Sequence, residues 1–125
     1  MAHVSGKEMA KTVMVKIDGK MTMAVLPASY NVDFESLKQG LGASKVELAH
    51  EWEFKHSFPD CEVGAMPPFG NLYNMPVFVA EELTKDKEIA FNSGTLTELF
   101  MMEYKDFKEL VRPKVIRFAA ARQAA

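Results

Sequence analysis

Apolar and polar residues alternate near the start of the chain, and this period of two predicts one β-strand over residues 9–17 and a second over 21–26. The intervening Asp18-Gly19 suits a two-residue hairpin turn, because both residues tolerate positive φ. On the first strand Lys11 shares the more apolar face with Val13, Val15 and Ile17. A lysine in the inward phase of a strand is unusual, so Lys11 is a candidate functional residue.

Short helical and strand patterns interleave along the rest of the chain. Apolar residues at i, i+3 and i+7 after Asp33, a good N-cap, predict a helix over 34–41 that ends at Gly42. Similar patterns predict helices over 51–58 and 104–111, strands over 45–49, 77–79, 88–91 and 97–103, a short apolar run at 115–116, a loop over 27–31 and a frayed tail over 119–125. A tight hairpin followed by interleaved elements predicts a single α/β domain over 1–125 with a mixed sheet.

Composition and charge narrow the class of protein. Of the 125 residues, 48% are hydrophobic and 26% charged, which is typical of one globular domain. The net charge of −2 argues against a protein that binds a nucleic-acid backbone over many phosphates, so any such contact would be local. One cysteine excludes an internal disulfide, and the histidines show no metal-binding spacing, so no metal is expected. Without a signal sequence or a long apolar run, we expect a cytoplasmic protein with no membrane contact.

Residues 59–76 are rich in proline, glycine and asparagine and include Gly64-Ala65-Met66-Pro67-Pro68-Phe69-Gly70. Gly64 permits a close backbone approach, and the two prolines stiffen the segment. Such a loop can point successive N–H groups into one concavity, where they stabilise an oxyanion. A plain rigid connector has the same pattern. Lys11 is equally open to two interpretations, an anion-binding ammonium at the rim of a pocket or an aliphatic stem whose ammonium reaches solvent.

Five segments taken together resemble the YbaK/prolyl-tRNA-synthetase-associated domain family. They are residues 10–12, 24–28, 58–70, 76–79 and 91–95, in the family's order. The similarity runs from about residue 2 to about residue 113, and the block 58–70 is its most specific part.

The resemblance implies an editing domain that hydrolyses the ester of mischarged tRNA, either fused to prolyl-tRNA synthetase or free-standing. It implies a mixed, partly closed sheet surrounded by helices, and no metal or organic cofactor. Its partners would be the acceptor end of mischarged tRNA and, as a further option, an aminoacyl-tRNA synthetase, with no DNA. The residues that it implies are Lys11 and Gly64 as catalytic, and Ala65, Met66, Pro67, Pro68, Gly94 and Thr95 as substrate-binding.

The chain departs from the family's pattern at Leu96, where relatives often carry histidine, and at Ala80, where many carry an acidic residue. It also begins almost at the lysine strand, where many relatives have an N-terminal helical segment. These departures favour the alternative of a non-catalytic module that binds aminoacyl-tRNA or a synthetase in the same cleft. A thiol-based redox protein that uses Cys61 is a weaker alternative, because the neighbouring carboxylates would raise the pKa of the thiol.

Overall fold

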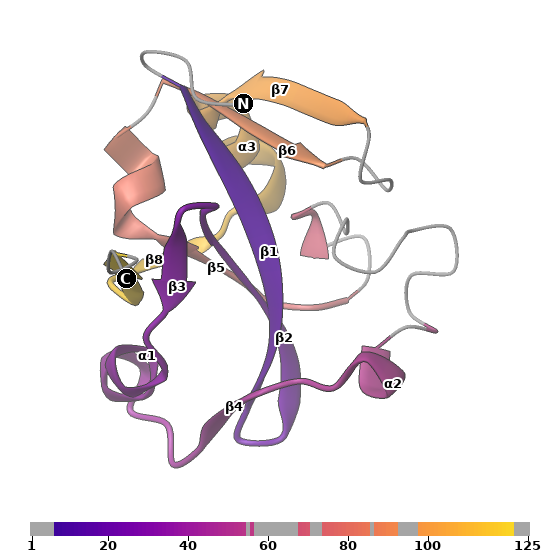
Figure 1. The fold of residues 1–125 in the computed structure, drawn as a ribbon, viewed down its shortest axis with the longest axis vertical. Coiled ribbons are helices and arrows are strands. Elements are labelled where there is room, and N and C mark those ends of the chain that lie inside the picture. The colour runs from indigo at the N-terminus through magenta and orange to yellow at the C-terminus, as the bar shows by residue number, and fades with distance from the viewer. Residues whose placement is uncertain are drawn as a thin grey trace.

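The computed structural model describes residues 7–54, 56, 68–70, 74–85, 87–92 and 98–121. Within them, a sheet of seven strands has six strands in the order β7-β6-β1-β2-β5-β8 (Figure 1). The seventh strand, β4, also pairs with β1. Its strands are β1 (Lys7–Ile17), β2 (Lys20–Pro27), β4 (Val46–Leu48), β5 (Val77–Ala80), β6 (Glu88–Asn92), β7 (Leu99–Glu103) and β8 (Lys114–Ile116). The strands β3 (Tyr30–Val32) and β9 (Ala119–Ala121) form a second, two-stranded sheet. The helices are α1 (Phe34–Leu41), α2 (Glu51–Phe54), the 3₁₀ helix η3 (Glu81–Lys85) and α3 (Tyr104–Val111).

The large sheet is mixed, as the sequence predicted. The pairs β1–β2, β1–β4 and β6–β7 are antiparallel, whereas β1–β6, β2–β5 and β5–β8 are parallel. The turn between β1 and β2 has φ of 50° at Asp18 and 84° at Gly19, which confirms the predicted hairpin. With β6 beside β1 and β5 beside β2, this hairpin occupies the centre of the sheet.

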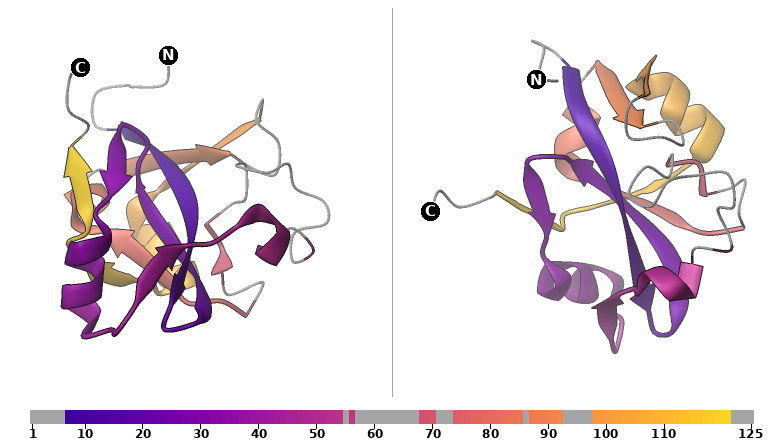
Figure 2. Two further views of the ribbon diagram at one scale, coloured as in Figure 1. Left: turned by 60° about the horizontal axis from the view of Figure 1, so that its bottom comes forward. Right: turned by 45° about the vertical axis from the view of Figure 1, so that its right-hand side comes forward.

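Both faces of the hairpin are buried. The first core cluster contains Ala10, Met14, Met23, Val25, Val77, Val79, Ile89, Phe91, Phe107 and their neighbours, and the second contains Val15, Ala24, Leu26, Leu37, Ala80 and Phe118. Helix α3 covers the first cluster, and α1 with the β3–β9 sheet covers the second (Figure 2). The sequence had indicated one inward face of β1, the one with Lys11. That prediction was incomplete, because Ala10 and Met14 on the opposite face are also buried.

Local signals fixed the ends of α1. The Asp33 carboxylate accepts a hydrogen bond from the backbone N–H of Ser36 (3.1 Å), and this bond lowers the pKa of Asp33. Gly42 closes the helix in the left-handed region with φ of 64°. The predicted bounds of α1 and α3 are confirmed.

Several predicted bounds differ from those observed. The expected loop 27–31 contains the start of β3, and the expected frayed tail contains β9, whose residues pair with β3. These two strands have three residues each and lie at distant places in the sequence, so neither carries a local signal. Strands β4 and β7 are shorter than predicted, and α2 ends at Phe54 in the described residues. No helix in the described ranges is long and apolar enough to cross a bilayer.

Burial on both faces of β2 makes a test of this architecture. Met23 and Leu26 are both 0% exposed, but they belong to the first and the second core cluster respectively. We expect Met23→Ala and Leu26→Ala each to lower the free energy of unfolding by about 2–5 kcal/mol, because each leaves a cavity. Urea denaturation measures both, and Lys20→Ala on the exposed end of the same strand should change stability by less than about 0.5 kcal/mol. A small effect of either core substitution would mean that its face is not packed.

Candidate functional site around Lys11 and the Pro68–Gly70 segment

Lys11 lies on β1 directly opposite Leu26 of β2 and is half-buried. Because side chains alternate along a strand, it shares the face of Val13 and Val15, which pack in or against the second core cluster. Lys11 therefore projects from the hairpin on the side of α1 and the β3–β9 sheet. The sequence predicted that Lys11 shares the apolar face of β1 with Val13 and Val15, and the structure confirms this.

The described end of the proline-flanked motif is anchored in the first core cluster. Pro68 and Gly70 are buried. The ring of Phe69 meets that of Phe91 edge-on, with centroids 5.4 Å apart, and lies 6.2 Å from that of Phe107 on α3. A Cβ atom on Gly70 would lie 2.5 Å from Cγ2 of Val77, so glycine is required for this close approach.

The two flanks of residues 55–67, the stretch that carries the motif, meet at one place on the hairpin. On the N-terminal side, the N–H of Ala49 donates to the carbonyl of Met14 (3.0 Å), and Phe54 is buried in the first core cluster. On the C-terminal side, Gly70 lies against Met23, the cross-strand partner of Met14. The Met14–Met23 pair thus fixes both ends of the motif-bearing stretch.

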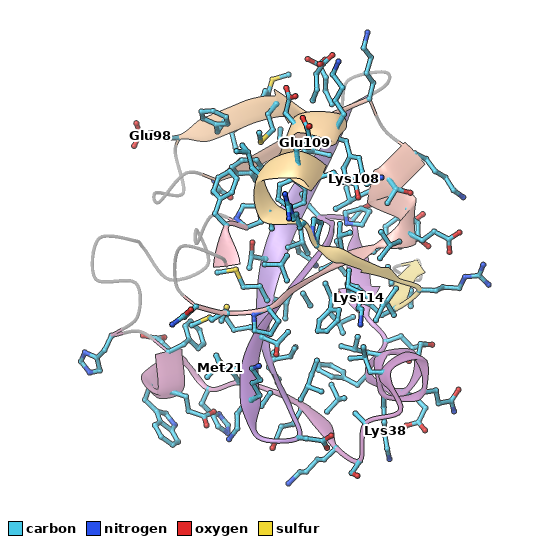
Figure 3. All side chains as sticks on the ribbon, turned by 180° about the vertical axis from the view of Figure 1, so that it is seen from behind. Met21, Lys38, Glu98, Lys108, Glu109 and Lys114 are labelled. Atoms are coloured by element: carbon cyan, nitrogen blue, oxygen red, sulfur yellow. The ribbon has the colours of Figure 1, made fainter. Side chains whose placement is uncertain are left out.

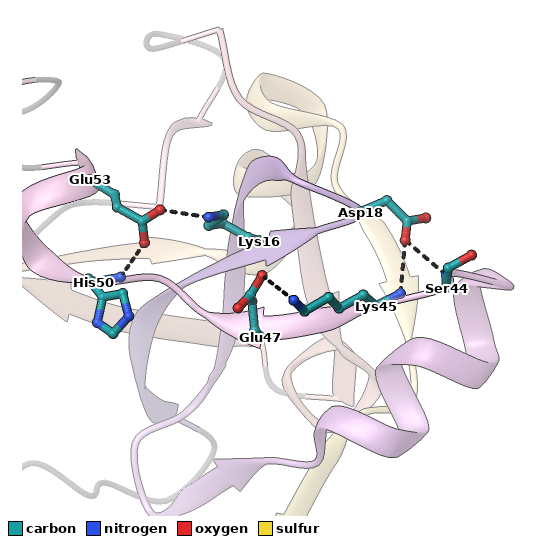
Figure 4. Close-up of polar contacts among 7 residues, drawn as sticks. All are labelled: Lys16, Asp18, Ser44, Lys45, Glu47, His50 and Glu53. Carbon is teal, nitrogen blue, oxygen red and sulfur yellow. Dashed lines mark hydrogen bonds and ion pairs between the residues drawn. The ribbon is translucent and has the colours of Figure 1, made fainter.

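Polar contacts strengthen the N-terminal flank (Figure 4). The ammonium of Lys16 on β1 donates to a carboxylate oxygen of Glu53 on α2 (2.7 Å), and the other oxygen accepts from the backbone N–H of His50 (2.8 Å). This hydrogen bond to Lys16 is the main cause that lowers the pKa of Glu53, and it raises the pKa of Lys16. The Asp18 carboxylate accepts from the N–H groups of Ser44 and Lys45, which ties the turn before β4 to the hairpin.

The structure does not place every predicted site residue. Gly64, Ala65, Met66, Pro67, Gly94 and Thr95 lie outside the described residues. Of the residues that are described, Lys11 and Pro68–Gly70 belong to opposite faces of the same hairpin, because Phe69 packs with the first core cluster and Lys11 projects toward the second. The convergence of Lys11 and Gly64 on one hollow stays a prediction.

Sequence reasoning missed several residues around this site. It did not single out the Lys16–Glu53 pair, which joins two elements without any sequence spacing that would reveal it. It also missed the Phe69–Phe91–Phe107 contacts, although Phe69 stands within the motif. Across the described ranges, no three histidine, cysteine, aspartate or glutamate side chains gather where they would hold a metal ion.

A model of the aminoacyl-tRNA editing domain matches residues 1–110. The chain belongs to the aminoacyl-tRNA editing domain family. It is 28% identical over 115 residues to the multifunctional Ser/Thr-tRNA deacylase ProXp-y of Escherichia coli K12, covering 87% of this chain and 68% of that protein. It is 31% identical over 68 residues to a proline–tRNA ligase of Bacillus mycoides, covering 54% of this chain and 12% of the ligase.

Solved structures share the fold of this editing domain. One is described as a candidate trans-editing enzyme for prolyl-tRNA synthetase and has a TM-score of 0.81 at 18% identity, with 96% of this chain and 74% of that chain covered. Another, hypothetical protein APE2540, has a TM-score of 0.80 at 24% identity, with 94% and 77% covered. The family and fold expected from the sequence are confirmed. The expected enzyme class, aminoacyl-tRNA deacylase, agrees with the family's description and with the name of the Escherichia coli relative.

Ala80, where the chain departs from the family's acidic residue, is buried in this editing domain. Ala80 ends β5, is 0% exposed and lies in the second core cluster. A carboxylate at that position would need a partner inside an apolar core. The next residue, Glu81, is acidic and pairs with Arg117 (3.1 Å). Leu96, the other departure, lies outside the described residues.

The close packing at Gly70 gives a mutational test. We expect Gly70→Ala to lower the free energy of unfolding by about 1–3 kcal/mol, because the added methyl meets Cγ2 of Val77 and, at 2.7 Å, the backbone oxygen of Met75. Gly40→Ala is the matched control, since its Cβ meets only a methyl of Ile116 at 3.1 Å and the substitution favours the helix. Thermal denaturation compares the two. Equal stability of both variants would contradict the close approach.

The Lys16–Glu53 pair predicts a pH dependence. The pKa of Glu53 is lowered from 4.5, so its contribution to stability is present above pH 4.5 and is lost as the pH falls through the folded pKa. The pKa of Lys16 is raised from 10.5, so its contribution is complete below pH 10.5 and is lost as the pH rises through the folded pKa. The stability difference between wild type and Glu53→Gln, measured by urea denaturation, should therefore be constant between these limits and shrink beyond each. A stability difference that stays the same at all pH values would contradict the ion pair.

Proposed function

We propose that this protein is a trans-editing aminoacyl-tRNA deacylase of the cytoplasm, which hydrolyses the ester between a wrong amino acid and the terminal ribose of a tRNA. The observation that carries the proposal is the family match over residues 1–110, which includes both Lys11 and the motif at Gly64–Pro68. The anchoring of both flanks of the motif at the Met14–Met23 pair supports it, because an oxyanion site must be held rigidly.

The reaction needs little acid–base machinery, because an aminoacyl ester is already activated. Water adds its oxygen to the carbonyl carbon, the bond from that carbon to the ribose oxygen breaks, and the products are the free amino acid and a tRNA with its hydroxyl restored. Backbone N–H groups of Gly64, Ala65 and Met66 would stabilise the tetrahedral oxyanion, and one such donor is typically worth about 3–4 kcal/mol.

Lys11 would act on a different part of the substrate. In this proposal its ammonium anchors the phosphate of the terminal adenosine and so positions the ester. Pro67, Pro68, Gly94 and Thr95 would line a small pocket that excludes larger side chains, as a second editing sieve does. No step uses a metal or organic cofactor.

Deacylation of a panel of mischarged tRNAs by the purified protein tests the proposal. We expect at least one ester to be cleaved faster than in buffer. Loss of one charged contact to a phosphate corresponds to about 1.5–3 kcal/mol, so Lys11→Ala should lower kcat/KM for that ester by about 10- to 150-fold. Lys11→Arg, which keeps the charge, should lose less, and Lys20→Ala on the exposed turn should match wild type.

The same panel separates the proposed enzyme from the non-catalytic module. If no ester is cleaved faster than in buffer, the enzymatic proposal fails. Binding of aminoacyl-tRNA without turnover would then identify a binding module. An unchanged rate in Lys11→Ala, alongside activity in wild type, would leave the deacylase standing and remove Lys11 from its mechanism.

A further inference from the structure

Basic side chains follow one side of α3. Lys105, Lys108 and Arg112 stand at i, i+3 and i+7, and all three are exposed. The opposite side of the helix carries Tyr104, Phe107 and Val111, which are buried in the first core cluster. The helix is therefore apolar toward the sheet and basic along one outer edge.

Two separate hollows in the surface lie along this edge and share one lining residue. One, of about 590 Å³, is lined by Lys105, Lys108, Glu109 and Arg112. The other, of about 270 Å³, is lined by Lys87, Glu103, Tyr104 and Lys105, so that Lys105 is common to both. The N–H of Tyr104 donates to the carbonyl of Lys87 (2.8 Å), which holds Lys87 at the start of α3. We call Lys87, Lys105, Lys108 and Arg112 the α3 basic strip.

Acidic residues border the strip without cancelling its charge. Glu103 lies 3.6 Å from the ammonium of Lys105, and Glu109 lines the larger hollow. Among the residues that line the two hollows, four are cations and two are carboxylates, in a chain whose formal net charge is −2. Asp106, in the first turn of α3, is also exposed but lines neither hollow. Figure 3 shows Lys108 and Glu109 on the outer surface of α3, above Lys114 of β8 on the same side of the molecule.

The helix that carries the strip packs against the described end of the motif. Phe107, on the buried side of α3, lies 6.2 Å from the ring of Phe69, which follows Pro68 directly. An α-helix with its side chains is about 10–12 Å across, so the strip and the end of the motif are separated by little more than one helix. A polyanion that lies along α3 would thus run past the described end of the motif, Pro68–Gly70.

We propose that the α3 basic strip binds the ribose–phosphate backbone of tRNA beyond its reacting end. This inference rests on the proposed function for the identity of the polyanion. From Lys105 to Arg112 the helix rises by about 10 Å, which is long enough to contact consecutive phosphates. Ammonium and guanidinium groups on an exposed edge bind phosphates with little desolvation and without reading sequence. A local strip also suits a protein whose formal net charge is −2, because such a protein has no overall basic excess to attract RNA.

Binding of uncharged tRNA to the full chain at several salt concentrations tests the strip without requiring hydrolysis. We compare wild type with the triple variant Lys105→Gln/Lys108→Gln/Arg112→Gln. The control triple, Lys20→Gln/Lys38→Gln/Lys45→Gln, loses the same number of positive charges on other elements: the start of β2, helix α1 and the segment before β4. Figure 3 shows Lys38 at the opposite end of the molecule from α3. Circular dichroism and thermal denaturation establish that both triples are folded.

We expect the α3 triple to bind uncharged tRNA about tenfold or more weakly near 0.1 M salt, with a salt slope shallower by about two to three, since each lost phosphate contact removes about one. The control should keep most of the affinity and the slope of wild type. Equal affinity of the α3 triple and wild type, or equal losses in both triples, would overturn the inference.

The outcome is separable from that of the proposed function. If wild type binds tRNA through the strip but hydrolyses no ester, the deacylase proposal fails and the strip stands. If wild type hydrolyses a mischarged tRNA and the α3 triple keeps the same kcat/KM and the same tRNA affinity, the strip fails and the deacylase stands. Loss of binding to an aminoacyl-tRNA synthetase alone, with tRNA binding intact, would also overturn it.

Discussion

Burial of the β1–β2 hairpin on both faces is the constraint on which the rest of the structure depends. Shifting its register by one residue would move the side chains of both core clusters to the opposite faces of the sheet. Both faces are packed, so only one register buries all of these side chains in their own clusters. Positive φ at Asp18 and Gly19 fixes the turn and with it the register. Strands β5 and β6 pair in parallel with β2 and β1, so their positions in the sheet depend on the register of the hairpin.

This constraint explains why Ala49 and Gly70, on the two sides of residues 55–67, are held at Met14 and Met23 respectively. The two methionines are directly paired and belong to the first core cluster, so any segment that packs against them is fixed relative to both strands. The long, unbranched thioether of methionine fits the irregular gap beside Gly70, where a methyl group would clash. The flanks of residues 55–67 are thereby attached to the central, buried hairpin of the sheet.

Local chemistry allowed the hairpin, α1 and α3 to be predicted from the sequence, because a turn dipeptide, an N-cap and i, i+3 spacing act within a few residues. The β3–β9 pairing and the Lys16–Glu53 contact were not predictable in this way, since they join distant segments. The second buried face of β1 was missed because Thr12 and Lys16 made it look polar, although Met14 between them is only 3% exposed. At the candidate site, the residue pattern singled out Lys11 and the Gly64–Gly70 motif, whereas the family resemblance supplied their roles and added Gly94 and Thr95. Neither predicted how these residues are arranged in space.

The division of the hairpin into two faces also bears on how an editing site is built. A side chain on a strand cannot change faces without a register shift, so Lys11 has a fixed base and only its own stem can move. The motif, in contrast, is tied at its two flanks on the other face and at Phe69 to α3. A substrate held by both would be gripped at two points whose separation is set by the sheet itself. In the proposed mechanism, the entropic cost of positioning the ester would then be met when the protein folds, before any tRNA binds.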